Sequence, residues 1–218
     1  MTLFEFRLYL RDCGDAFPKI IIFSCPRTGS TLVYNLVKEV FDTYTVEKIH
    51  KIDKFDNEIL YIIPIRHPYN SIISIGLCNK VKFYKHQDLL NCVNNYFDYG
   101  GNDIINIQDG ENILHLHYEN FFNNLEYVYK SIEEKLNINI PEYIKTNVIK
   151  KHSLENVKNL IKNMNDFKLV DNETQYHGLH ISKYNGTTNY RLLLSEEQIK
   201  YLKKFTKLNK IIQKFNYK

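Results

Sequence analysis

The sequence of 218 residues contains no tryptophan, five prolines, four cysteines and no long uninterrupted apolar run. The cysteines have neither the paired spacing of a metal site nor the density of a disulfide scaffold, so we expect reduced, mostly buried thiols. No stretch reaches the ~18 apolar residues of a membrane span, and charges interrupt the N-terminal segment where a secretory signal would be apolar. These absences favour a soluble, cytoplasmic protein.

The chain also lacks a strong charge of either sign, since its net charge is +4. This excess suits a small anionic ligand and is too weak to indicate nucleic acid. The apolar content predicts a real core, and the length suits one domain spanning residues 1–218. Apolar β-branched runs alternate with helical periodicity, which predicts the α/β class with a mainly parallel sheet.

The expected elements follow from these periodicities and from turn residues. Strands are expected at 3–10, 20–23, 44–50, 59–65, with Pro64 at its carboxyl end, and 113–118. One helix is expected to follow the turn after residue 23 and to end at about residue 42. Others are expected at 68–79, at 86–99, where two glycines end the helix, at 121–136 and at 195–208. A further helical segment is expected to begin at residue 141. Residues 163–190 are rich in Asn, Asp, Gly, Thr and Tyr and predict a long irregular segment.

A short turn follows the strand at 20–23 and precedes a helix. It reads Pro-Arg-Thr-Gly-Ser-Thr over residues 26–31, so it combines one glycine, three hydroxyls and the fixed charge of Arg27. Because the first N–H groups of a helix have no partner within it, such a turn can hold an anion. It is not a nucleoside-triphosphatase loop, because no lysine follows Gly29. An ordinary strand-to-helix turn is the alternative interpretation.

Two further strands end in chemically useful residues. The strand at 44–50 ends with Lys48 and His50, and ligands of parallel sheets bind beyond the carboxyl ends of strands. The strand at 59–65 is followed by Arg66, and Ser74 lies eight positions on in the next helix. A guanidinium binds phosphate as a bidentate fork. A surface lysine and histidine, and a common Arg-Pro helix start, are the alternatives without function.

In this order, these motifs resemble the sulfotransferases that use 3′-phosphoadenosine 5′-phosphosulfate (PAPS) and release adenosine 3′,5′-bisphosphate (PAP). The resemblance is collinear over about residues 19–205. It implies that the turn binds the 5′-phosphosulfate through Arg27, Thr28, Gly29, Ser30 and Thr31. It further implies that Arg66 and Ser74 hold the 3′-phosphate, that His50 is the general base, and that Lys48 and Arg27 stabilise developing charge. No metal is expected.

The resemblance extends more weakly to two later segments. Tyr118 closes a strand where the family has a tyrosine that helps to place the adenine. The family also closes a loop over the 3′-phosphate, and the corresponding stretch of this chain offers Lys183, Asn185, Gly186 and Arg191. The usual tryptophan is absent there, and Tyr190 stands near its place.

Glu47 is a rival base, because protein-tyrosine sulfotransferases use a carboxylate. Strand alternation puts it on the opposite face from Lys48 and His50. Arg27 replaces the more common lysine and cannot act as an acid, since guanidinium keeps its proton. The chain is also shorter than usual members, which leaves the acceptor open: a small molecule, glycan or peptide, with a hydroxyl as first choice and an amine as second.

Aromatic and histidine side chains between 83 and 99 are possible acceptor contacts, although such residues are more often core: Phe83, Tyr84, His86, Tyr96 and Tyr99. Two other functions stay open. One is a nucleotide or nucleoside kinase, which would need a lysine after the turn and a magnesium-binding aspartate. The other is a non-catalytic protein that binds PAPS or a polyanion.

Overall fold

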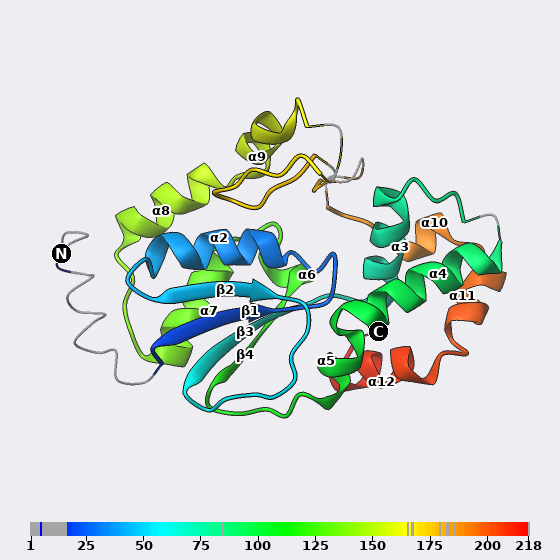
Figure 1. Ribbon diagram of the computed structural model, residues 1–218, viewed down its shortest axis with the longest axis horizontal. Coiled ribbons are helices and arrows are strands. Elements are labelled where there is room, and N and C mark those ends of the chain that lie inside the picture. The colour runs from blue at the N-terminus through cyan, green and yellow to red at the C-terminus, as the bar shows by residue number, and fades with distance from the viewer. Residues whose placement is uncertain are drawn as a thin grey trace.

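Four parallel strands form the central sheet, in the order β2-β1-β3-β4 (Figure 1). The structure is a computed structural model that describes Glu5 and residues 17–83, 85–164, 166, 168–178, 180–181, 184 and 186–217. The strands are β1 Lys19–Phe23, β2 Thr45–Ile49, β3 Ile59–Ile65 and β4 Ile113–His117. All three pairings are parallel, which confirms the predicted α/β class. The strand expected at 3–10 lies outside the described residues apart from Glu5.

Each face of the sheet is covered by its own helices, because successive residues of a strand point to opposite faces. Ile20 and Ile22 of β1 pack with α2 (Ser30–Val40), α7 (Glu126–Leu136) and α8 (Glu142–Lys151). Ile21 and Phe23 pack with α3 (Pro68–Cys78), α4 (His86–Tyr96) and α12 (Thr206–Lys214). Burial on both faces explains why the two inner strands, β1 and β3, are apolar runs, whereas the outer strands β2 and β4 are partly exposed and include polar residues.

The remaining helical elements are short. They are η1 Phe97–Gly101, α5 Asn102–Asn106, α6 Tyr118–Phe121, α9 Leu154–Ile161, α10 Tyr190–Leu193 and α11 Glu196–Leu202. Figure 1 shows α3, α4, α10 and α11 grouped beyond the end of the sheet to which the strand arrows point. None of the described helices combines the length and the apolar content needed to cross a bilayer.

The register brings the carboxyl ends of the strands, and the residues that follow them, to one edge of the sheet. Phe23 of β1 pairs with Ile49 of β2, and Ile65 of β3 pairs with His117 of β4. The turn after β1, the residue after β2 and the corners after β3 and β4 therefore lie at the same carboxyl edge, as expected for parallel strands. Pro64 lies beyond Ile62, the last residue of β3 that pairs with β1, in agreement with its expected place near the strand end.

Two helices that the sequence predicts as continuous are each interrupted in the structure, so the prediction of continuity was wrong. The helix expected over 121–136 is divided between α6 and α7 by a turn that contains Asn123 and Asn124, which are poor helix formers. The helix expected over 195–208 ends at Leu202, and α12 follows. In one continuous helix Leu202 and Ile211 would face about 180° apart. The interruption allows both of them to be buried.

The glycine pair at 100 and 101 ends the helix as predicted, because the backbone leaves the helical region at Tyr99 and Gly100. Helix α4 runs to Tyr96, and after the kink within η1 the chain continues into α5. Gly100 has a φ of +105°, and a Cβ atom there would lie 2.8 Å from the backbone oxygen of His50. The glycine therefore allows η1 to pass directly against the end of β2.

Candidate functional site

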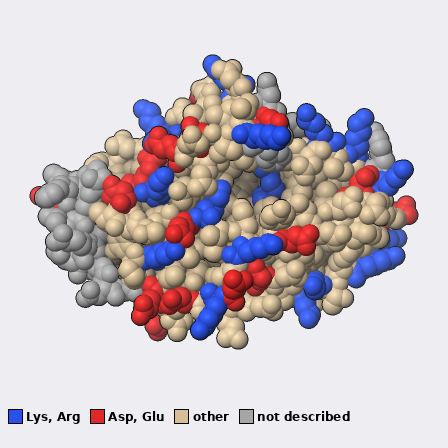
Figure 2. Space-filling view, viewed as in Figure 1, with Lys and Arg blue, Asp and Glu red and all other residues tan. Residues whose placement is uncertain are grey.

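A cavity of about 360 Å³ opens at the carboxyl edge of the sheet. Figure 2 shows this face hollowed between the α9 side and the α3 side, with basic side chains beside the hollow. The residues that line it include ten of those predicted from sequence: Arg27, Gly29, Ser30, Thr31, Lys48, His50, Arg66, Ser74, Tyr118 and Gly186. Lys183 and Asn185 lie outside the described residues.

The turn between β1 and α2 forms the floor of the cavity. Gly29 is the N-cap of α2 with a φ of +84°, and among the described residues no side chain caps the first turn. Ser30 and Thr31 begin the helix and line the cavity. Thr28 is fully buried and donates from Oγ1 to the Cys25 carbonyl at 3.0 Å, so its side chain holds the turn together. The uncapped helix start thus faces the cavity beside two hydroxyls.

Lys48 enters the cavity from the end of β2. Its Nζ donates to Thr31 Oγ1 at 2.9 Å, which joins the second strand to the turn. Burial lowers the pKa of Lys48 to about 8. The ammonium group is therefore weakly hydrated, and its charge acts strongly on whatever the cavity holds.

His50 follows β2 and has one ring nitrogen fixed. Nδ1 lies 2.7 Å from the carbonyl oxygen of Ser24. Because a carbonyl oxygen only accepts, Nδ1 carries the hydrogen and Nε2 keeps its lone pair. Burial lowers the pKa of His50, and the charge of Lys48 adds to this effect while the Ser24 bond opposes it. The neutral imidazole, with Nε2 as proton acceptor, is thus the favoured form near neutral pH.

Glu47, the rival base, is turned away from this group. Its carboxylate forms an ion pair with Lys19 at 2.7 Å on the neighbouring strand. It is not among the residues that line the cavity. Strand alternation separates it from Lys48 and His50, as the sequence indicated.

Arg66 occupies the corner between β3 and α3 and is 4% exposed. Its Nη1 donates to the Arg27 carbonyl at 3.1 Å, its Nη2 donates to the Gly186 carbonyl at 2.9 Å, and its guanidinium lies 4.2 Å from the centre of the Tyr118 ring. Nε is buried and has no hydrogen-bond partner among the described residues. One buried donor of a permanent cation thus stays available to an anion.

The described residues between 176 and 190, called the covering segment below, lie over this corner. Tyr118 donates from its hydroxyl to the Gly186 carbonyl at 3.0 Å, and Arg27 Nη2 donates to the His180 carbonyl at 2.9 Å. A Cβ atom on Gly186 would lie 2.3 Å from the Phe122 ring, so the backbone approaches as closely as only glycine permits. Arg191, named from sequence, is exposed on α10 and does not line the cavity.

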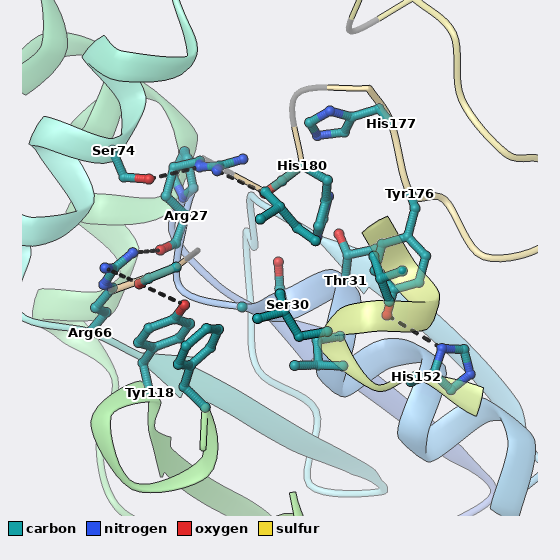
Figure 3. Close-up of a pocket in the computed structure, with 18 of the residues that line it drawn as sticks. Arg27, Ser30, Thr31, Arg66, Ser74, Tyr118, His152, Tyr176, His177 and His180 are labelled. Atoms are coloured by element: carbon teal, nitrogen blue, oxygen red, sulfur yellow. Dashed lines mark hydrogen bonds between the residues drawn. The ribbon is translucent and has the colours of Figure 1, made fainter. Parts of the chain in front are cut away.

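The lining residues that the sequence did not single out include three histidines and a tyrosine: His152, Tyr176, His177 and His180. Figure 3 shows His177, His180 and Tyr176 along the covering segment, with Tyr176 directed toward His152. Tyr176 Oη lies 3.4 Å from His152 Nδ1, and His152 Nε2 lies 2.5 Å from the Glu39 carboxylate. Burial lowers the pKa of His177 to about 4 and that of His180 well below the usual range. In the sequence, the two closely spaced histidines within 176–180 were the signal that could have indicated these lining residues.

None of the described residues of the aromatic stretch at 83–99 lines the cavity. Phe83 and Tyr96 are buried in the core beneath α3 and α4. His86 stacks on Tyr201 at the surface, and Tyr84 lies outside the described residues. These side chains are therefore structural, as the alternative interpretation held.

No family model matches this chain, and no curated protein matches it in sequence. Solved structures do match. Retinol dehydratase in complex with androsterone and the inactive cofactor PAP has a TM-score of 0.63 at 14% identity, over 94% of this chain and 85% of that one. The same enzyme with retinol and PAP gives 0.59 at 14%, over 95% and 86%.

Mouse sulfotransferase SULT7A1 in complex with PAP matches with a TM-score of 0.53 at 12% identity, over 88% of this chain and 83% of that one. Identities this low concern the fold and leave individual residues untested. Together with the parallel sheet and its strand-turn-helix corner, they identify the architecture: the chain has the PAPS-dependent sulfotransferase fold.

Proposed function

We propose that this protein is a sulfotransferase that moves the sulfonyl group of PAPS to a hydroxyl of a small acceptor. The observation that carries the proposal is the composition of one cavity. It combines an uncapped helix start, the partly buried Lys48, the buried Arg66, and the imidazole of His50 with Nε2 as proton acceptor. No Asp or Glu is among the described residues that line it.

The residues present fit PAPS. Ser30, Thr31 and the first N–H groups of α2 would hold the 5′ end, beside Lys48. Arg66 and Ser74 would hold the 3′-phosphate, because Arg66 Nε is a buried donor without a partner among the described residues. Tyr118, whose ring packs against the Arg66 guanidinium, would contact the adenosine. Gly186 would close the same end, with Lys183 and Asn185 as further candidates in the covering segment.

PAPS supplies the sulfonyl group when it is bound. His50 Nε2 takes the proton of the acceptor hydroxyl, and the Ser24 carbonyl keeps the ring in the tautomer that can do so. Lys48, held on Thr31, meets the negative charge that develops at the transferring group. Arg27 and Arg66 donate to the carbonyls of His180 and Gly186, which hold these residues over the cavity.

The acceptor we propose is a small organic alcohol. Retinol dehydratase, a structural neighbour, is described in complex with androsterone or retinol as well as PAP. Leu154, Val157 and Ile181 add apolar surface to the cavity of this chain. An amine, a glycan or a peptide is the second choice. We further propose that the protein acts in the cytoplasm, since Cys25 and Cys92 are buried free thiols.

Ligand-dependent melting separates this function from a kinase. At 100 times its Kd, PAP should stabilise the protein by about 2.7 kcal/mol. For a chain of this size that corresponds to a rise in Tm of about 5–10 °C. ATP with Mg²⁺ should give a smaller rise, because it has no 3′-phosphate for Arg66. A larger shift with ATP and Mg²⁺, or no shift with PAP, contradicts the proposal.

A transfer assay separates the enzyme from a non-catalytic binder. PAPS that is labelled in its sulfonyl group is incubated with a panel of alcohols, phenols and amines, and the labelled product is measured. Transfer to hydroxyl compounds is expected. PAP binding without transfer to any panel member would favour the non-catalytic alternative.

A further inference from the structure

His180 lines the cavity, and its side chain takes no part in the transfer step described above. The Nδ1 atom of its ring is buried and has no hydrogen-bond partner among the described residues. A buried polar atom without a partner costs free energy unless a bound molecule supplies one. The ring of His180 is therefore a candidate contact for the ligand of this cavity.

Contacts on two sides fix the position of His180 in the cavity. Its carbonyl accepts from Arg27 Nη2 at 2.9 Å, which ties the residue to the turn between β1 and α2. Its ring packs edge-on against the ring of Tyr176, with the two ring centres 4.8 Å apart. Figure 3 shows the His180 side chain between Arg27 and Tyr176, with Ser30 and Thr31 below it.

The chain just before the covering segment is bound to α2. Asn35 Nδ2 donates to the Thr174 carbonyl and to the Thr31 carbonyl, each at 2.8 Å. Asn35 is buried, so solvent does not compete for these bonds. His180 is thus held near the start of α2, which is where we propose that the 5′ end of the nucleotide binds.

The protonation state of His180 suits a place that already has two cations. Burial lowers the pKa of His180 well below its usual range, and the nearby Arg27, His177 and Lys48 lower it further. The ring is therefore neutral near neutral pH, and one of its nitrogens carries a hydrogen. A neutral imidazole adds a donor beside Arg27 and Lys48 without the repulsion that a third positive charge would cause.

We propose that His180 donates from Nδ1 to the 5′-phosphate of the bound nucleotide, and that it completes the 5′ seat from the covering segment. The bound anion would supply the partner that Nδ1 lacks among the described residues and would select the tautomer with the hydrogen on that atom. This inference rests on the proposed function and adds one contact to it. The residues of the turn and Lys48 keep the roles given above.

Calorimetric titration with PAP and with adenosine 3′-monophosphate tests the assignment, because the two ligands differ only in the 5′-phosphate. The His180→Phe variant keeps a ring against Tyr176 and removes the donor. It should raise the Kd for PAP by ~10-fold or more and change the Kd for adenosine 3′-monophosphate by less than ~3-fold. His180→Asn puts an amide N–H close to the position of Nδ1 and should restore most of the PAP affinity. His86→Phe, which changes a surface histidine that stacks on Tyr201, should alter neither Kd.

Unchanged PAP affinity in His180→Phe, or equal weakening of both ligands, overturns the inference and leaves the proposed function intact. Wild-type protein that does not bind PAP removes the proposed function and this inference with it. If His180→Phe does not fold, wild-type protein with nitrogen-15 in its histidine rings serves, and His180→Asn identifies the His180 signals. PAP should shift these signals and adenosine 3′-monophosphate should not. No shift with PAP, or the same shift with both ligands, would also overturn the assignment.

Discussion

The His50→Ala variant is expected to lose ~10²–10⁴-fold in turnover while its affinity for PAP stays within about twofold of wild type. His50 is the base that we assign, because the Ser24 carbonyl occupies Nδ1 and leaves Nε2 as acceptor. Alanine removes this acceptor and leaves both phosphate-binding corners in place. Single-turnover sulfate transfer and calorimetric titration with PAP measure the two quantities separately.

His86→Ala is the matched control, since this histidine stacks on Tyr201 outside the cavity. It should retain wild-type turnover. Wild-type turnover in His50→Ala would instead show that the base is wrongly assigned, and Glu47→Gln would then be examined.

The pH dependence of kcat/KM gives an independent check on the same residue. The lowered pKa of His50 means that the neutral base persists below pH 6.5, so the acid limb should lie below that value. The alkaline limb should fall near pH 8, where Lys48 loses its proton. Because kcat/KM reports the free enzyme, both limbs refer to the protein without ligand. Lys48→Arg should move the alkaline limb upward, and an unmoved limb would exclude Lys48 as its cause.

The Arg66→Ala variant is expected to weaken PAP binding by ~10²-fold with little change in turnover at saturating PAPS. A charge-assisted hydrogen bond contributes about 1.5–3 kcal/mol, and Arg66 presents its buried Nε to the 3′-phosphate seat. The substitution also removes the Arg66 hydrogen bonds to the Arg27 and Gly186 carbonyls, of which the latter keeps its bond from Tyr118, so a lower Tm is expected. Calorimetric titration measures the loss of PAP affinity, and rate measurements at saturating PAPS measure the change in turnover.

Arg66→Lys is the control for shape, because it keeps the positive charge without the fork. Its PAP affinity should lie between those of wild type and Arg66→Ala. PAP affinity equal to wild type in Arg66→Ala, measured on folded protein, would place the 3′-phosphate elsewhere.

Local signals were sufficient to predict the strands and the corners that follow them. The apolar runs around Ile20–Phe23 and 59–65 could only be buried strands, and parallel strands bring their carboxyl ends to one edge. Arg27, His50 and Arg66 each stand directly after, or a few residues after, such a strand. Their common location therefore followed from topology, without knowledge of any long-range contact.

Contacts between distant segments could not be predicted in this way. Arg27 reaches the His180 carbonyl across 153 positions, and Arg66 reaches Gly186 across 120. Both partners are backbone carbonyls, which leave no trace in the residue types. The direction of the Arg27 side chain and the histidines of the covering segment depend on this packing, so composition alone gave no account of them.

The predictions of two uninterrupted helices failed for a related reason. The pattern around Leu202 and Ile211 satisfies helical periodicity on each side separately, and only the position of the core decides that the chain must turn between them. Gly100, by contrast, was correctly predicted to end a helix, and its close approach to the His50 carbonyl is a second reason for glycine there.

A crystal structure of the protein with PAP tests the central claim most directly. We predict the 3′-phosphate on Arg66 and Ser74, the 5′-phosphate at the start of α2 beside Lys48, and His50 Nε2 facing the space where an acceptor would bind. A nucleotide bound outside this cavity, or with its two phosphates exchanged between the corners, would contradict the account.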